Sequence, residues 1–188
     1  MRQFLVVLAN AVGVVSCSSS TSSQGNGQNT APEHAITHTG GSAVETTVDG
    51  SRIIGPNVML QRDEKGLRGQ GPLGVVDLRN EGNTLRGFIG QQPTELHLVP
   101  NEKGGFLMRG MFGGILSSLE VTPEHIQGQL GRCQYDLQRY PAETGVAYNG
   151  QRICGAHIME PTTITLSPTI NALPPLERAA LIAVLLGR

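Results

Sequence analysis

Apolar and polar residues alternate with a period of two through much of the chain, which is the pattern of half-buried β-strands. Between Leu85 and Ile89, for example, Leu85, Gly87 and Ile89 point to one face while Arg86 points to the other. A turn containing Gly or Pro follows, and then a second alternating run such as residues 95–98. Each such unit predicts a β-hairpin.

The hairpin pattern is repeated along the chain. An apolar residue, a polar residue and a glycine recur as Leu67-Arg68-Gly69, Leu85-Arg86-Gly87, Met108-Arg109-Gly110, Ile126-Gln127-Gly128 and Tyr148-Asn149-Gly150. Nine positions after each glycine stands a large apolar residue, namely Leu78, Leu96, Leu119, Leu137 and Met159. Residues 52–60 look like a degenerate first copy. We therefore predict a mainly β fold, an antiparallel meander of repeated β-hairpins that forms a closed barrel or a two-layer sheet and so avoids bare edges.

The repeated glycine lies on the apolar side of its strand, where a glycine weakens the strand. Its presence predicts either a sharp bend or the close approach of another element, for which the C-terminal segment is the candidate. Residues 175–186 predict one C-terminal helix, because proline precedes them and Gly187 follows. This segment is apolar on nearly every side after Arg178, so we expect it to be buried against the sheet. The alternative is a helix that docks on a membrane or a partner.

Composition narrows the function further. The formal charge of the 188 residues is -1, which gives no basic excess of the kind that nucleic-acid binding requires. Tryptophan is absent and aromatic residues make up 4% of the chain, which disfavours an aromatic platform for sugars or bases. The length suits a single globular domain.

The N-terminus has the three parts of a signal peptide: a charged start with Arg2, an apolar stretch over residues 4–15, and a small residue before Cys17. The residues Val14-Val15-Ser16-Cys17 resemble the lipobox of bacterial lipoproteins. The resemblance implies removal of residues 1–16, a diacylglycerol on the sulfur of Cys17, and acylation of the new amino terminus. An ordinary signal peptide cleaved near Cys17 is the alternative.

Ser18 stands where an aspartate would, in well-studied enteric bacteria, resemble an inner-membrane retention signal. We therefore expect an outer-membrane protein that is anchored by lipid. Residues 17–45 are rich in Ser, Thr, Gly and Asn, and predict a disordered linker between the anchor and a β-domain over residues 46–188. His34 and His38, four positions apart in this linker, are expected to be solvated and not to bind metal.

Assigning Cys17 to lipid leaves Cys133 and Cys154 as an even pair. They lie in successive repeat units, so a disulfide between neighbouring strands is expected in an oxidising compartment. A redox-active or metal-binding pair is the alternative, but the Cys-x-x-Cys spacing is lacking.

Three arginines, Arg68, Arg86 and Arg109, occupy equivalent positions in the repeat and form a candidate interaction face. Acidic residues also share a repeat position, namely Asp77, Glu95 and Asp136. Cross-strand ion pairs are the first interpretation of these two rows. Arginines without such partners would instead contact an anion or a lipid headgroup. His97, His125 and His157 occupy different repeat positions and predict no metal site.

The sequence has no Gly-x-Ser-x-Gly elbow, His-Glu-x-x-His motif or phosphate loop, so we expect no enzyme activity, cofactor or metal. The first hypothesis is a non-catalytic membrane-anchored lipoprotein whose β-domain binds a protein or envelope component in an assembly, structural or surface role. The second is a β-barrel that binds a small apolar ligand or inhibits an envelope-directed hydrolase. A filled interior favours the first hypothesis, and a cavity of ~300 Å³ with convergent polar groups favours the second.

Overall fold

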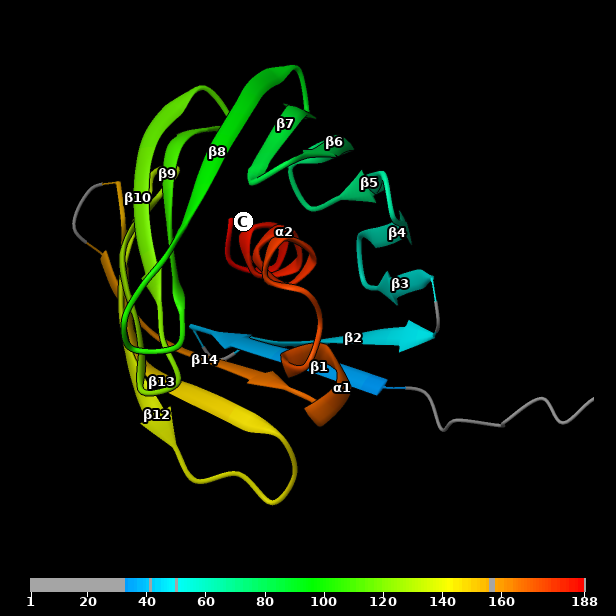
Figure 1. The fold of residues 1–188 in the computed structure, drawn as a ribbon. Coiled ribbons are helices and arrows are strands. Elements are labelled where there is room, and N and C mark those ends of the chain that lie inside the picture. Colours follow the sequence, from blue (N-terminus) through cyan, green and yellow to red (C-terminus); the bar gives the residue numbers. More distant parts are fainter. Residues whose placement is uncertain (1–32, 41, 50, 156–157, 188) are drawn as a thin grey trace, which may run out of the picture. The chain divides into compact units, whose positions relative to one another are not determined.

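The computed structural model describes residues 33–40, 42–49, 51–155 and 158–187. They form a closed antiparallel barrel in which every strand pairs with its neighbours in the sequence and β1 pairs with β14 (Figure 1). The strands are β1 (Glu33–Thr39), β2 (Ser42–Asp49), β3 (Arg52–Gly55), β4 (Val58–Asp63), β5 (Gly66–Gly71), β6 (Gly74–Glu81), β7 (Thr84–Ile89), β8 (Gln92–Pro100), β9 (Phe106–Phe112), β10 (Ile115–Val121), β11 (His125–Leu130), β12 (Cys133–Tyr140), β13 (Val146–Cys154) and β14 (Ile158–Leu166). The helices are α1 (Pro168–Asn171) and α2 (Pro175–Leu186).

The predicted meander of hairpins with a C-terminal helix is confirmed, and of the two expected forms the closed barrel is the correct one. Closure depends on the pairing of β1 with β14, which places Ala35 opposite Leu166 and Thr37 opposite Ile164. A closed barrel leaves no strand edge unpaired, and this removes the usual route to edge-to-edge aggregation.

The repeat corresponds to the register of the hairpins. Four apolar pairs that the repeat relates lie directly opposite each other on neighbouring strands, namely Leu67 and Leu78, Leu85 and Leu96, Met108 and Leu119, and Ile126 and Leu137. All of these side chains are buried. The last unit departs from the pattern, because Tyr148 faces Ile164 and Met159 lies on the outside of the barrel with 61% of its surface exposed.

The repeated glycine permits a close approach between strand backbones. Gly87 has a φ of 153°, and a Cβ atom at this position would lie 1.8 Å from the carbonyl oxygen of Asp77 on β6. Gly69, Gly110 and Gly128 show the same positive φ and the same close contact with the preceding strand. Of the two interpretations of this glycine, close approach therefore holds. The approaching element is the neighbouring strand, so the expectation that it is the C-terminal segment is wrong.

Helix α2 fills the interior of the barrel (Figure 1). Every residue from Ala179 to Leu186 is buried, which requires contacts on all sides of the helix. Those contacts come from strands around the barrel: α2 packs on β5, β6 and β7, and the Tyr135 hydroxyl of β12 donates a hydrogen bond of 2.5 Å to the Leu186 carbonyl. That bond satisfies a carbonyl at the helix end which has no partner within the helix.

Two features differ from the sequence-based expectation. Strands β1 and β2 lie partly within residues 17–45, so the predicted linker boundary at residue 45 is wrong and the barrel begins at Glu33. Their inward side chains include Ala35, Thr37 and Thr46, which are small or polar and so give a weak apolar signal. The short helix α1 was also not predicted; the Ser167 side chain caps its start.

Neither helix in the described part of the chain has the length and apolar character needed to cross a bilayer.

Candidate functional site

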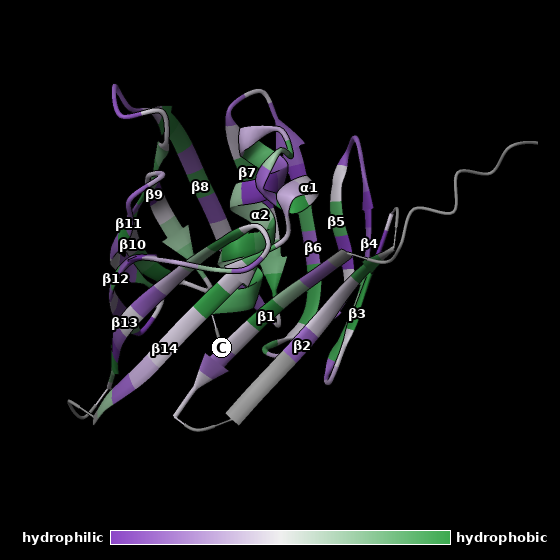
Figure 2. Ribbon diagram, turned by 90° about the horizontal axis from the view of Figure 1, so that it is seen from below, coloured by the Kyte–Doolittle hydropathy of each residue, from purple (hydrophilic) through white to green (hydrophobic). Residues whose placement is uncertain are grey.

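The two ends of the barrel differ in charge. Turns after even-numbered strands form one end, called here the acidic end. Its described turn residues hold four carboxylates, Glu64, Glu102, Glu124 and Glu143, against two lysines, Lys65 and Lys103. Arg62 and Arg139, on the adjoining strands, pair with Glu177 and Glu124. Turns after odd-numbered strands form the other end, called here the rim end. Among the described residues of these turns, Arg132 alone carries a charge. Figure 2 shows the β4–β5 and β8–β9 turns of the acidic end in purple and α2 in green.

Exposed apolar side chains gather on the outside of the barrel next to the rim end. We call this set the apolar rim: Ile54, Met59, Leu73, Val75, Phe88, Met111, Leu116 and Met159. Leu116 is the most exposed of them, at 78%. Because these large apolar side chains gather at one end of the barrel, the apolar rim is the strongest candidate for a binding surface. Two other exposed large hydrophobic residues, Val99 and Tyr140, lie near the acidic end.

The apolar rim follows the register of the sheet. Ile54 and Met59 are opposite each other on β3 and β4, and Met111 and Leu116 are opposite each other on β9 and β10. On each strand from β3 to β14, the outward position nearest the rim end is uncharged; the polar exceptions to the apolar character are Gln70, Gln129 and Gln134. The sequence contained this signal at the strand ends, but it becomes visible only once every turn has been placed.

The predicted arginine face lies directly beside the apolar rim. Arg68, Arg86 and Arg109 occupy the next outward position on β5, β7 and β9, away from the rim end. Arg68 Nε lies 3.4 Å from Asp77 Oδ1, and Arg86 Nη2 lies 2.8 Å from Glu95 Oε1. The Arg86 guanidinium holds the pKa of Glu95 below its usual value, mainly through this hydrogen bond.

Arg109 and Asp136 do not follow the predicted ion-pair pattern. Within the described residues, Arg109 makes no ion pair and lies opposite Ser118 on β10 and His97 on β8. Asp136 accepts a hydrogen bond of 3.1 Å from Gln138. The prediction of cross-strand ion pairs therefore applies to two of the three arginines, and the Arg109 guanidinium is exposed to solvent.

A hollow of about 320 Å³ opens at the rim end of the barrel. Its lining includes Gly187 at the end of α2, Phe112 and Leu130 from the strands, and Leu73 from a turn of the apolar rim. Arg132 is the charged residue among its lining residues. The hollow is a shallow mouth above the end of α2, and the interior below it is filled by that helix.

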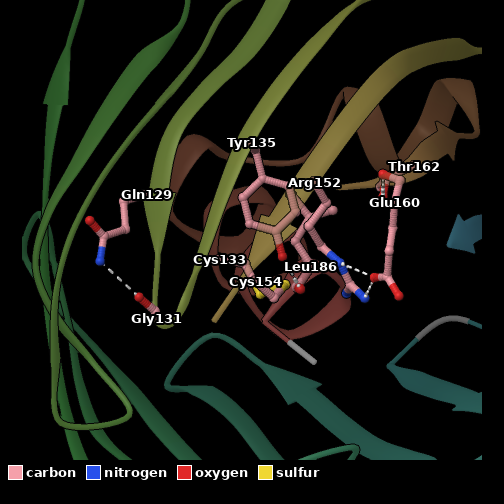
Figure 3. Close-up of a disulfide and its surroundings, with 9 residues drawn as sticks. All are labelled: Gln129, Gly131, Cys133, Tyr135, Arg152, Cys154, Glu160, Thr162 and Leu186. Atoms are coloured by element: carbon pink, nitrogen blue, oxygen red, sulfur yellow. Dashed lines mark hydrogen bonds and ion pairs between the residues drawn. A yellow bond between two sulfur atoms is a disulfide. The ribbon is translucent and has the colours of Figure 1, made fainter. Parts of the chain in front are cut away.

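The predicted disulfide joins Cys133 and Cys154 across β12 and β13 at this mouth (Figure 3). Cys133 lines the hollow. Arg152 and Glu160, which sequence reasoning did not single out, form an ion pair nearby, with Nη2 and Oε2 2.5 Å apart. Because both side chains are partly buried, the pair neutralises two charges that would otherwise be left at the mouth of the barrel.

Replacing both Cys133 and Cys154 with serine is expected to lower the free energy of unfolding by about 3 kcal/mol, because the bridge closes a loop of 21 residues in the unfolded chain. Urea denaturation with and without reductant measures the effect. A chain with Cys17→Ala keeps the Cys133–Cys154 disulfide, and its free energy of unfolding should fall when reductant breaks that bond. The double serine variant should be insensitive to reductant. If reductant also destabilised that variant, the assignment of the stability to this disulfide would be contradicted.

A threonine, a histidine and a glutamate come together at the acidic end in an arrangement that resembles a nucleophile, a base and an acid. His125 Nδ1 lies 3.1 Å from Thr122 Oγ1, and His125 Nε2 lies 3.1 Å from Glu120 Oε2. However, Thr122 Oγ1 accepts hydrogen bonds from the backbone N–H groups of Glu124 and His125, at 3.2 and 2.9 Å. These bonds occupy its lone pairs and hold it in the turn, so the cluster is explained as turn stabilisation.

The same cluster predicts a pH effect on stability. Hydrogen bonds from His125 and Asn101 hold the pKa of the Glu120 carboxyl below its ordinary value of 4.5, against the effect of burial. A lowered pKa in the folded state stabilises the protein above about pH 4.5, and the contribution is lost as pH falls through the folded-state pKa. Glu120→Gln should therefore unfold at lower urea concentration than the parent at pH 6. This difference should shrink towards pH 3, and a constant difference would contradict the prediction.

The remaining predicted residues do not form a site. Cys17 and His157 lie outside the described residues. His34 Nδ1 pairs with Glu45 Oε1 at 2.7 Å on the outside of the barrel, and no cluster of three or more metal-binding side chains occurs in the described part of the chain.

No protein-family model, curated protein or solved structure matches this chain. Its function must therefore be inferred from the surface and the interior of the barrel themselves. Of the features described, the apolar rim has the clearest chemical meaning, because it exposes large apolar side chains on strands whose inner faces already form a full core.

Proposed function

We propose that this protein is a non-catalytic, lipid-anchored protein of the bacterial outer membrane, and that its barrel binds an envelope component through the apolar rim. The observation that carries the proposal is the uncharged rim end with its exposed apolar side chains, such as Leu116 and Phe88. The occupied interior supports it, because α2 lies inside the barrel and every residue from Ala179 to Leu186 is buried. The lipobox resemblance at Cys17 supports the anchor.

Two experiments in cells test the two parts of this proposal. A fatty-acid analogue should label the protein, and Cys17→Ala should abolish the label; a label that persists in this variant would overturn the anchor. For the apolar rim, a photo-crosslinking amino acid at Leu116 should give adducts with envelope lipid or protein. The matched probe at Val99, which is also exposed but lies near the acidic end, should not. Equal yields at both positions would overturn binding through the rim.

A second candidate function is the binding of a small apolar ligand at the mouth of the barrel. The hollow of about 320 Å³, lined by Phe112, Ile89 and Leu130, favours it. Native mass spectrometry of protein purified without detergent distinguishes the two functions. A bound compound at one molecule per chain, lost in a variant with Leu73→Arg at the exposed edge of the hollow, would establish the second function. A chain mass without a ligand would support the first.

A further inference from the structure

We propose that the apolar rim is a membrane-contact surface, so that the rim end of the barrel lies on a leaflet containing anionic lipid. This inference rests on the proposed function and names lipid as the envelope component that the rim contacts.

The apolar rim extends around much of the barrel. Exposed apolar side chains at the rim end occur on β3, β4, β6, β7, β9, β10 and β14. A partner protein that contacts one side of the barrel would need apolar residues on only one strand pair, such as Met111 and Leu116. A set that faces outward on seven strands around the barrel is contacted at once only by a surrounding medium. The headgroup and acyl boundary of a bilayer is such a medium.

The turns at the rim end suit this location. They are short and rich in glycine and proline, as in Pro72-Leu73 and Gly113-Gly114, and Leu73 projects from its turn with 47% of its surface exposed. Arg132 is the one charged residue in the described part of these turns. Few charges would therefore have to leave water when the rim end enters the interface.

The arginine row lies at the depth where lipid phosphates would be. Arg68, Arg86 and Arg109 are two residues beyond the outward positions of the rim end on their strands, which is ~7 Å along a strand. Asp77, Glu95 and Asp136 lie at the same depth, and the first two pair with Arg68 and Arg86, so Arg109 is the arginine of this row left for a phosphate. Interfacial elements bury their apolar face by about 5–10 Å. Arg109, with no ion pair among the described residues, has its guanidinium available for a phosphate.

The acidic end of the barrel is unsuited to contact with an anionic leaflet. The described turns of the acidic end hold Glu64, Glu102, Glu124 and Glu143 against Lys65 and Lys103, and an anionic leaflet repels this excess of negative charge. Attraction at one end and repulsion at the other select a single orientation on the membrane.

The proposed anchor is compatible with this orientation although β1 begins at the acidic end. The chain between Cys17 and Glu33 can reach ~55 Å when extended. This is longer than β8, whose nine residues span ~30 Å. The tether is therefore long enough for the barrel to turn its rim end towards the leaflet that holds the lipid.

The chain has no tryptophan, so a single introduced tryptophan reports on its own position. Phe88→Trp places the probe in the apolar rim, and Tyr140→Trp places a matched probe, 56% exposed in the parent, near the acidic end. Both are made in the full chain with Cys17→Ala, whose N-terminal segment contributes equally to each. The vesicles contain phosphatidylethanolamine and phosphatidylglycerol.

With these vesicles, Phe88→Trp should show a blue-shifted emission and strong quenching by brominated acyl chains, and Tyr140→Trp should show neither. No response from Phe88→Trp, or equal responses from both probes, would overturn the inference. If the rim probe at Leu116 still cross-links to protein in cells, the proposed function survives while lipid contact fails, so the two failures are distinguishable.

Side-chain variants in the Phe88→Trp chain separate the two contributions to binding. Met111→Gln with Leu116→Gln should weaken partitioning into vesicles about tenfold, and Val99→Gln should leave it unchanged. Arg109→Gln should weaken binding to anionic vesicles about fivefold and leave binding to phosphatidylcholine unchanged. Arg139→Gln, at the acidic end, is its control. A dimer in solution that Leu116→Gln dissociates, together with no vesicle binding, would assign the rim to a second copy and overturn the inference.

Discussion

Ile182→Asp is expected to prevent stable folding of the barrel, with a loss of about 4–5 kcal/mol in the free energy of unfolding. Ile182 is completely buried in α2, and the helix is surrounded by the strands. An aspartate there would put a carboxylate in an apolar core, and the base one turn earlier on α2, Arg178, already donates a hydrogen bond to the Asn171 carbonyl. The far-ultraviolet circular dichroism spectrum and urea denaturation measure the effect.

Leu116→Asp is the matched control for this prediction. It makes the same change of an aliphatic residue to aspartate at a position that is 78% exposed, and its stability should lie within about 0.5 kcal/mol of the parent. If Ile182→Asp were also tolerated, α2 would not be an essential part of the core. The barrel interior would then be open to a ligand, and the second candidate function would gain support.

Gly87→Ala is expected to cost about 4 kcal/mol, although it adds only one methyl group. The alanine Cβ would lie 1.8 Å from the Asp77 carbonyl oxygen. In addition, residues other than glycine rarely adopt a φ of 153°. Strands β6 and β7 would have to separate at the centre of the sheet. Thermal and urea unfolding of the variant measure the loss.

Gly82→Ala is the control for the backbone conformation alone. Gly82 has a φ of 64°, and a Cβ atom there would meet nothing within 4 Å, so only the conformational cost of about 1–2 kcal/mol applies. Similar losses in the two variants would mean that the close approach of β6 and β7 is not important for stability.

The hairpins and α2 could be predicted from sequence because their signals are local. Leu85 and Leu96 face each other within one hairpin, and residues 175–186 carry a proline at one end and Gly187 at the other. The disulfide could be predicted because it joins adjacent repeat units, once Cys17 had been assigned to lipid.

The remaining features depend on partners that are distant in the chain. Strand β1 is held by pairing with β14, and the inward residues Thr37 and Thr46 of β1 and β2 do not look like core residues in isolation. The apolar rim emerges only when the barrel brings one end of every strand together. The sequence likewise left two alternatives, a closed barrel or a two-layer sheet, because it does not show that β1 pairs with β14.

The position of α2 also constrains the order of folding. The hairpins involve local contacts and can form as the chain emerges, but the seam between Ala35 and Leu166 and the filling of the core by α2 both require the C-terminal part of the domain. The barrel therefore cannot close around its core until residues 158–187 have been delivered. Until residues 158–187 have been synthesised, the chain would remain unfolded as a barrel. A polypeptide that crosses a membrane before it folds does so in such an unfolded state.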